Sequence, residues 1–440
     1  MSDTTASAPT LLRAMGKWTL AGLVLNSIIG TGVFVLPGTI AGILGRWSIL
    51  AWVMAAAITG AMILSFAEVA SRFTGAGGAY LYAHSAFGRF AGVQMAWFVY
   101  LARCVSGAVQ ANLFTTYLAE FWAPAATRAG GVLCTTVFIG VLTAVNIRSV
   151  MSGAGVSNGF ALIKSLSLIL FAVLGLAWVA TGHGIPDLVG DDTSVRGWLG
   201  ALLLLMFAFG GFESALIPLA EAREPRRDAP FALMTGLAIV TVIYIVVQVT
   251  ILATLPDPDA TNRPLAGAAR VMLGAPGAAI ITLAAVLSVT GWMASNLLNV
   301  PRLTMAMAHQ GDLPRVFGVI HPRFRTPWVS ILLFAGVAWA LANMAGLLTN
   351  LSLSAVSRLA IYGGVCAALP VFRRRDRAGR HQGEASTASF VAPWGTGLAV
   401  ISVIVSVVLA TQMSRREAIP LVVLVLLASL HAAWLSRRRT

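Results

Sequence analysis

Charged residues are scarce in this chain. They make up 10% of its 440 residues, whereas hydrophobic residues make up 58% and the mean hydropathy is +0.84. This composition excludes a soluble domain of ordinary make-up. Runs of about 20 apolar residues, long enough to cross a bilayer as helices, recur along the chain. The runs predict an all-α polytopic membrane protein with 12 transmembrane helices.

Cysteines and catalytic motifs are also sparse. Only three cysteines occur, Cys104, Cys134 and Cys366, and they fall far apart inside predicted spans without metal-ligand spacing. The six histidines are scattered and form no His-Glu-x-x-His pattern. The sequence therefore predicts no cofactor, no metal site and no enzymatic activity.

We also expect no cleavable leader. The first apolar span has no small-residue cleavage site, so we expect it to be retained as a helix. The formal net charge of +14 would suggest a nucleic-acid partner in a soluble protein. Here most of the 30 Lys and Arg residues fall in segments that become cytoplasmic when the N-terminus is placed inside. This bias predicts no nucleic-acid partner, and a multi-pass protein of the cytoplasmic (inner) membrane with both termini cytoplasmic.

Two apolar spans are interrupted by glycines. Gly30 and Gly32 interrupt residues 28–34, and Gly210 and Gly211 interrupt residues 207–213, about half the folded chain further on. Unwound backbone inside a bilayer is tolerated only where it lines a cavity or holds a ligand. A matched pair of such breaks indicates a secondary transporter built from inverted repeats.

The two breaks predict how the chain is organised. We expect a single transmembrane domain over residues 1–440, with repeat 1 at about 18–182 and repeat 2 at about 198–372. Two peripheral packing helices follow at about 390–436. The longest polar stretch, residues 373–389, is too short and too charged to fold alone, so no soluble domain is expected.

Five short motifs along the chain are similar to those of a known family. They are Gly30-Thr31-Gly32 with Phe34, residues 77–80 with Phe87-Gly88, residues 207–213, residues 221–230, and Arg302 with residues 311–314. On these motifs the chain resembles the amino acid-polyamine-organocation (APC) superfamily, and within it the amino acid permeases, over nearly its whole length. The resemblance implies a leucine-transporter-like fold, a 5+5 inverted repeat whose first and sixth helices are broken.

The resemblance also places the substrate between the two breaks, and the chemistry of unwound backbone agrees. Free amides at the start of a half-helix suit a carboxylate, and exposed carbonyls suit an ammonium group. These are the two ends of an amino acid. A related amine would share the ammonium end. The expected substrate-binding residues are Ile28, Gly30, Thr31, Gly32, Phe207, Ala208 and Gly210.

Two further residues have roles that the resemblance implies. Phe207 resembles the aromatic gate that covers the substrate, although it could equally be a packing residue. Lys164 lies within the fifth span, where a lysine is costly unless it is used. In the family a lysine at the matching place stands in for a sodium ion, and its burial would ease proton release and couple transport to protons. The alternative is that Lys164 extends to the cytoplasmic surface and only anchors the helix.

Glu213 and Arg103 are the other charges expected inside the bilayer. Glu213 could bind a proton, and so take part in coupling, or a cationic substrate group; alternatively it is paired and has no role in coupling. Arg103 needs a partner, and Glu213 is the candidate by elimination. If Arg103 faces the site instead, it would repel cationic substrates.

Together these observations predict a secondary active transporter that moves amino acids by alternating access, proton-coupled and sodium-independent. The alternatives are an amino acid or amine exchanger (antiporter) and, more remotely, a sensor on the same fold that does not transport. The expected partners are the small-molecule substrate, protons and the lipid bilayer. Oligomeric state is left open, with a homodimer as one alternative.

Overall fold

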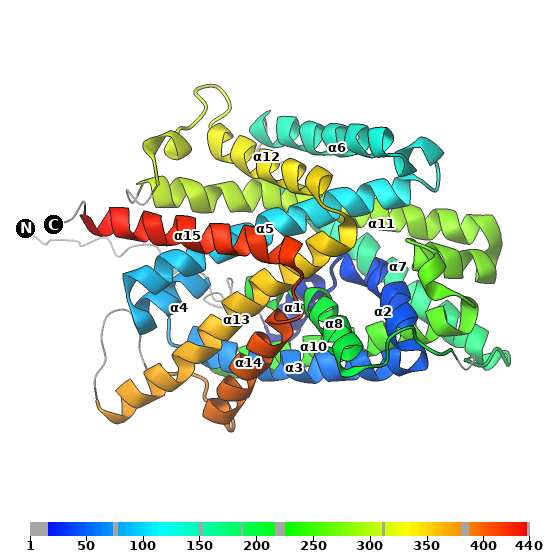
Figure 1. Ribbon diagram of the computed structural model, residues 1–440, viewed down its shortest axis with the longest axis horizontal. Helices are drawn as coiled ribbons and strands as arrows, with labels where there is room; N and C mark the ends of the chain where they lie inside the picture. The colour runs from blue at the N-terminus through cyan, green and yellow to red at the C-terminus, as the bar shows by residue number, and fades with distance from the viewer. Residues whose placement is uncertain are drawn as a thin grey trace, which may run out of the picture.

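The computed structural model describes residues 16–73, 78–148, 153–185, 188–215, 225–309, 313–379 and 387–437. Within them every regular element is a helix (Figure 1). Seven helical segments are long and apolar enough to cross a membrane, and three shorter apolar helices accompany them. The predicted class, a helical membrane protein, is confirmed, whereas the count of 12 spans stays a prediction.

The helices follow one another with short connections. The α-helices are α1 (Lys17–Ile28), α2 (Leu36–Leu44), α3 (Ser48–Ala70), α4 (Gly78–Phe87), α5 (Arg89–Leu118), α6 (Arg128–Arg148), α7 (Gly153–Ala180), α8 (Val195–Ala208), α9 (Phe212–Ala215), α10 (Pro225–Thr254), α11 (Pro264–His309), α12 (Trp328–Met344), α13 (Leu347–Arg377), α14 (Gly395–Ala410) and α15 (Arg415–Arg437). The 3₁₀ turns are η1 (Gly32–Phe34), η2 (Gly45–Trp47), η3 (Ala123–Ala126), η5 (Pro258–Ala260) and η6 (Arg315–Gly318).

The first apolar span is interrupted at its glycines. α1 ends at Ile28, the chain then forms the short turn η1, and α2 begins at Leu36. Glycine favours such an interruption because its helix propensity is low. Pro37 lies in the first turn of α2, where a missing backbone amide breaks no helical hydrogen bond. The first half-helix therefore ends in the middle of the span.

A second interruption separates α8 from α9. α8 begins at Val195 and is capped by Ser194, whose hydroxyl accepts a hydrogen bond from the Gly197 amide at 3.3 Å; the helix ends at Ala208. Gly211 has a φ of 112°, a conformation that L side chains rarely adopt. The chain thus leaves the helix between Phe209 and Gly211 and re-enters it at Phe212.

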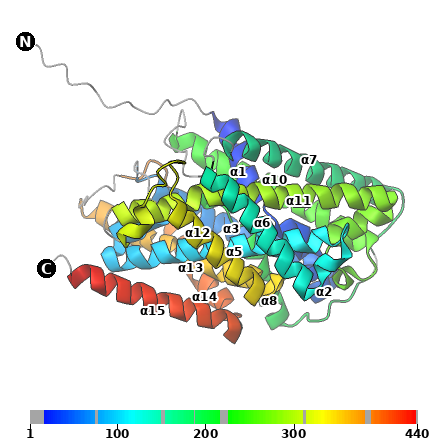
Figure 2. The ribbon, with the colours of Figure 1, turned by 90° about the horizontal axis from the view of Figure 1, so that it is seen from above.

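The two breaks lie inside the bundle. α13 packs along α5 and also contacts α3 and α8, α1 packs on α10, and α7 packs on α10 and α11. The last two helices pack on the outside: α14 packs on α13 and α3, and α15 runs along α5 (Figure 1) and lies at the edge of the bundle when it is seen from above (Figure 2). This arrangement places α10 against the helix that ends at the first break, and α3 and α13 against the helix that ends at the second.

Parts of three motifs used in the sequence analysis lie outside the described residues. They are Gly77, residues 221–224 and residues 311–312. The two ends of the chain, residues 1–15 and 438–440, also lie outside them. Every residue expected in the substrate site, by contrast, is described.

Candidate functional site

The two helix breaks contact one another directly. A methyl group built on Gly32 would lie 3.0 Å from Cα of Ala208 and 3.2 Å from the ring of Phe207. One built on Gly211 would lie 2.3 Å from the carbonyl oxygen of Ser27. Glycine at these positions lets backbone approach backbone. The structure therefore brings together the two segments that the sequence analysis placed at the substrate site.

Tyr244 of α10 connects the two breaks. Its hydroxyl lies 3.2 Å from the carbonyl oxygens of both Ile28 and Ala208, to which it donates, and its ring packs edge-on against Trp52 and Phe209. These carbonyls close α1 and α8 and have no helical partner. Ile28 and Ala208, two of the residues expected to bind substrate, thus already have carbonyls that face a protein donor, with a second lone pair each to spare.

The amides of the first break are available to a ligand. Thr31 and Gly32 are buried, and within the described part of the chain their amides make no backbone hydrogen bond. The hydroxyl of Thr31 accepts a hydrogen bond of 3.1 Å from Nε2 of Gln110 on α5. A methyl on Gly30 would contact only the carbonyl oxygen of Ile28, at 3.6 Å, so this glycine has space around it. This segment is suited to bind a carboxylate.

Lys164 reaches the first break from α7. Its Nζ donates to the carbonyl oxygen of Asn26 at 3.1 Å and to that of Ile29 at 2.5 Å, and the side chain is buried. The C-terminal end of a helix carries partial negative charge and unpaired carbonyls, which favour a cation. The structure thus places the ammonium on the broken end of α1, in the interior of the protein.

Glu213 is held by four donors at the second break. Its Oε1 lies 3.2 Å from Nη1 of Arg358 and 3.5 Å from Nη2 of Arg103. Its Oε2 accepts hydrogen bonds from the Tyr362 hydroxyl at 2.7 Å and the Gly211 amide at 3.0 Å. α5, α9 and α13 are tied together by this carboxylate, and Arg103 lies beside the glutamate that elimination had named.

Sequence reasoning missed Arg358 as a site residue. This arginine is buried on α13, donates from Nη2 to the Ser106 hydroxyl at 3.3 Å, and lies 5.7 Å above the ring of Phe207. A methyl on Gly210 would lie 2.7 Å from its Nη1. The available signal was an arginine inside an apolar span, which marks a functional position by default.

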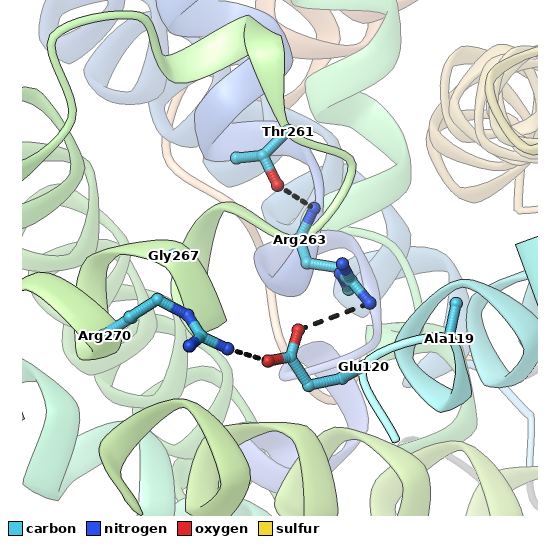
Figure 3. Close-up of a pocket in the computed structure, with 6 residues that line it drawn as sticks. All are labelled: Ala119, Glu120, Thr261, Arg263, Gly267 and Arg270. Atoms are coloured by element: carbon cyan, nitrogen blue, oxygen red, sulfur yellow. Dashed lines mark hydrogen bonds and ion pairs between the residues drawn. The ribbon is translucent and has the colours of Figure 1, made fainter. Parts of the chain in front are cut away.

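A separate polar pocket of about 380 Å³ lies where α5 ends and α11 begins (Figure 3). Glu120 is ion-paired with Arg263 at 3.3 Å and with Arg270. The backbone amide of Arg263 donates to the Thr261 hydroxyl at 3.1 Å. In the described part of the chain no group of His, Cys, Asp and Glu side chains could hold a metal ion. The pocket therefore presents two arginines that are paired with one glutamate, and it lies apart from the two helix breaks.

Comparison with known proteins agrees with this geometry. A family model described as "Amino acid permease" matches residues 15–429. The chain is 26% identical over 386 residues to the methylthioribose transporter of Bacillus subtilis, covering 84% of this chain and 83% of the relative. It is 29% identical over 374 residues to the serine/threonine exchanger SteT of the same species, covering 81% and 82%.

A third relative is the branched-chain amino acid permease BcaP of Bacillus subtilis. It is 24% identical over 394 residues, covering 84% of this chain and 83% of the relative. The family match extends over nearly the whole chain and includes both breaks, Lys164 and Glu213. The chain therefore belongs to the amino acid permeases of the APC family.

Proposed function

We propose that this protein moves amino acids across the cytoplasmic membrane as a secondary active transporter that works by alternating access. The observation that carries the proposal is the close approach of two helix breaks inside an amino acid permease: a methyl group built on Gly32 would lie 3.0 Å from Cα of Ala208. Unwound backbone at this depth is favourable when it binds a ligand. The amides of Thr31 and Gly32 would take the carboxylate of the substrate. The carbonyls of Phe207 and Gly210 would take its ammonium group.

We further propose that the fold is a 5+5 inverted repeat of 12 spans, with α14 and α15 peripheral. In this scheme α7 and α13 are the fifth spans of their halves. Lys164 on α7 reaches the break in α1, and Arg358 on α13 reaches the break after α8. In each half, the fifth span thus supplies a cation to the break in the first span, which supports two copies of one structural repeat.

Phe207 is our candidate for the gate. A methyl group built on Gly32 would lie 3.2 Å from its buried ring. The Arg358 guanidinium lies over the ring, 5.7 Å from the ring centroid. A ring between the two breaks would have to move when a substrate enters or leaves. Gate opening would therefore disturb the contact between Phe207 and Arg358.

Coupling is proposed to run through Lys164 and to be independent of sodium. The ammonium already donates hydrogen bonds to the carbonyls of Asn26 and Ile29. In a sodium-dependent protein such carbonyls would be free to bind the sodium ion. Release of its proton would remove the charge from these hydrogen bonds, weaken them and so loosen the end of α1. Glu213, by contrast, is engaged by four donors, so we give it the role of holding the second break together.

The alternative is an exchanger, which the name of one relative, the serine/threonine exchanger SteT, favours. In either case we place both chain ends on the cytoplasmic side, since this puts most of the basic residues inside. An exchanger needs substrate on both sides of the membrane, whereas a proton-coupled carrier needs only a proton gradient. The two mechanisms therefore separate in a reconstituted system.

The test is uptake of radiolabelled amino acids, with methylthioribose included, into proteoliposomes that carry either a proton gradient or unlabelled substrate inside. Lys164→Ala is compared with Lys17→Ala, because Lys17 is the only other lysine of the chain and lies at the exposed start of α1. Gradient-driven uptake that is lost only in Lys164→Ala supports proton coupling. Uptake that needs internal substrate and persists in Lys164→Ala identifies an exchanger. No uptake of any amino acid would overturn the proposed function.

A further inference from the structure

The charges at the second break do not balance. Two guanidinium groups, those of Arg103 and Arg358, share the single carboxylate of Glu213. The helices that carry the breaks and these cations, namely α1, α5, α7, α8, α9 and α13, contain one further acidic residue, Asp376. Asp376 pairs with Arg72 at the end of α13. The cluster of Arg103, Arg358 and Glu213 therefore carries a net charge of +1.

This excess charge is buried and permanent. Arg358 is 5% exposed, and an arginine side chain does not lose its proton in proteins. Charges in the interior act over a longer range than charges in water, since the surroundings screen them less. Lys164 adds another cation at the first break. A ligand between the breaks therefore meets a positive field, and the six helices named above offer no further carboxylate beside it.

Arg358 is in contact with the substrate segment itself. It lies against Gly210 and over Phe207, two of the residues expected to bind substrate. Its Nη1 and Nη2 are used by Glu213 and Ser106. Its Nε is buried and has no hydrogen-bond partner among the described residues. A buried donor without a partner is unfavourable, so Nε is available to an acceptor on a ligand.

We propose that the cluster of Arg103, Arg358 and Glu213 selects substrates by charge, so that the protein accepts amino acids with neutral or anionic side chains and rejects cationic ones. The proposal rests on the proposed transport function and names its substrate class. The α-carboxylate and α-ammonium groups are common to all amino acids and are met by the backbone of the breaks. Discrimination therefore falls on the side chain, and like charges placed close together in a buried site are a strong repulsive element.

Binding measurements on the purified full chain test this proposal without requiring transport. Lysine is compared with norleucine, which has the same aliphatic chain without the ammonium group, and glutamate is compared with glutamine. We expect lysine to bind about tenfold or more weakly than norleucine, because a unit charge several ångströms from a buried cation is repelled by at least this factor. Glutamate should bind at least as well as glutamine. Equal affinity for lysine and norleucine would overturn the proposal.

Two variants show whether the cluster is responsible. Arg358→Gln and Arg103→Gln each leave one arginine opposite Glu213 and reduce the net charge to zero, so each should narrow the difference between lysine and norleucine by about tenfold. Arg302→Gln is the matched control, since Arg302 is exposed on α11, and it should leave the ratio unchanged. A folded Arg358→Gln protein with the ratio of the unmodified chain refutes the role of this cluster.

The comparison of lysine with norleucine on the unmodified chain tests the charge selection even if both variants fail to fold. The failure of this inference also differs from that of the transport function. If norleucine and lysine bind alike and are transported, the function stands and the charge selection is wrong. If no amino acid binds or moves, the proposed function itself is wrong.

Discussion

Replacing Gly32 with alanine would place a methyl group between the two helix breaks. The added carbon would lie 3.0 Å from Cα of Ala208, 3.2 Å from its Cβ and 3.2 Å from the ring of Phe207. Carbon atoms in ordinary contact lie about 3.5 to 4.0 Å apart, so the backbone of α8 would have to move by several tenths of an ångström. Overpacking of this kind costs about 1 to 3 kcal/mol.

The initial rate of transport should fall in proportion to the Boltzmann factor of this energy cost. If the productive state needs the contact between Gly32 and Ala208, a cost of about 1 to 3 kcal/mol reduces the population of that state by about 5- to 150-fold. The assay is initial uptake into proteoliposomes, together with thermal unfolding of the purified protein in detergent. Monodisperse elution would show that the variant is folded.

Gly22→Ala is the control for this prediction. Gly22 lies within α1, and a methyl group built on it would have no atom within 4 Å. Alanine is favoured over glycine in a helix by about 0.5 to 1 kcal/mol, so this variant should keep its uptake and be slightly more stable. If Gly32→Ala transports as well as Gly22→Ala, the two breaks do not need their close contact and the reasoning is refuted.

Three other substitutions probe the contacts around the breaks and the peripheral pocket. Tyr244→Phe keeps the ring packing but removes the donor shared by two carbonyls, and we expect a loss of about 1 to 3 kcal/mol in thermal unfolding; an unchanged stability would contradict the bridging role. Lys164→Met leaves two carbonyls of α1 without their cation and should lower stability by about 1 to 3 kcal/mol, whereas Lys17→Met should leave it nearly unchanged. Glu120→Gln breaks pairs whose arginines are 28% and 53% exposed, so the loss should be about 1 kcal/mol or less and should shrink at high salt; a larger loss that salt does not affect would show that the pocket is rigid and dry.

Local features of the sequence were sufficient to predict the helical class and both breaks. Long apolar runs have few stable conformations in a bilayer other than helices, and glycines inside them mark where a helix can be interrupted. α1 ends at Ile28, two residues before Gly30, and α8 ends at Ala208, two residues before Gly210. Lys164 was singled out for the same kind of reason, because a charge inside an apolar run is costly wherever the helix lies.

The partners of the buried charges could be predicted only in part. Scarcity of acidic residues pointed to Glu213 as the partner of Arg103, since few carboxylates share its depth, but it gave no reason to add Arg358 from a helix 145 residues further along. Tyr362 lies one helical turn after Arg358, so the two reach the carboxylate from the same face of α13. A pairing between helices depends on their rotation and depth, which apolar patterning specifies only weakly when a helix is surrounded by apolar groups on all sides.

The sequence by itself determined that this chain is a helical membrane protein, that two spans are broken at glycines, and that a few buried charges need partners. Only the tertiary structure decided that the breaks touch at Gly32 and Ala208, that Tyr244 bridges them, and that two arginines share Glu213. The physical reason is the range of the interactions. Helix formation and its interruption depend on neighbouring residues, whereas contacts between helices join residues far apart in the chain and are fixed only when the whole bundle packs.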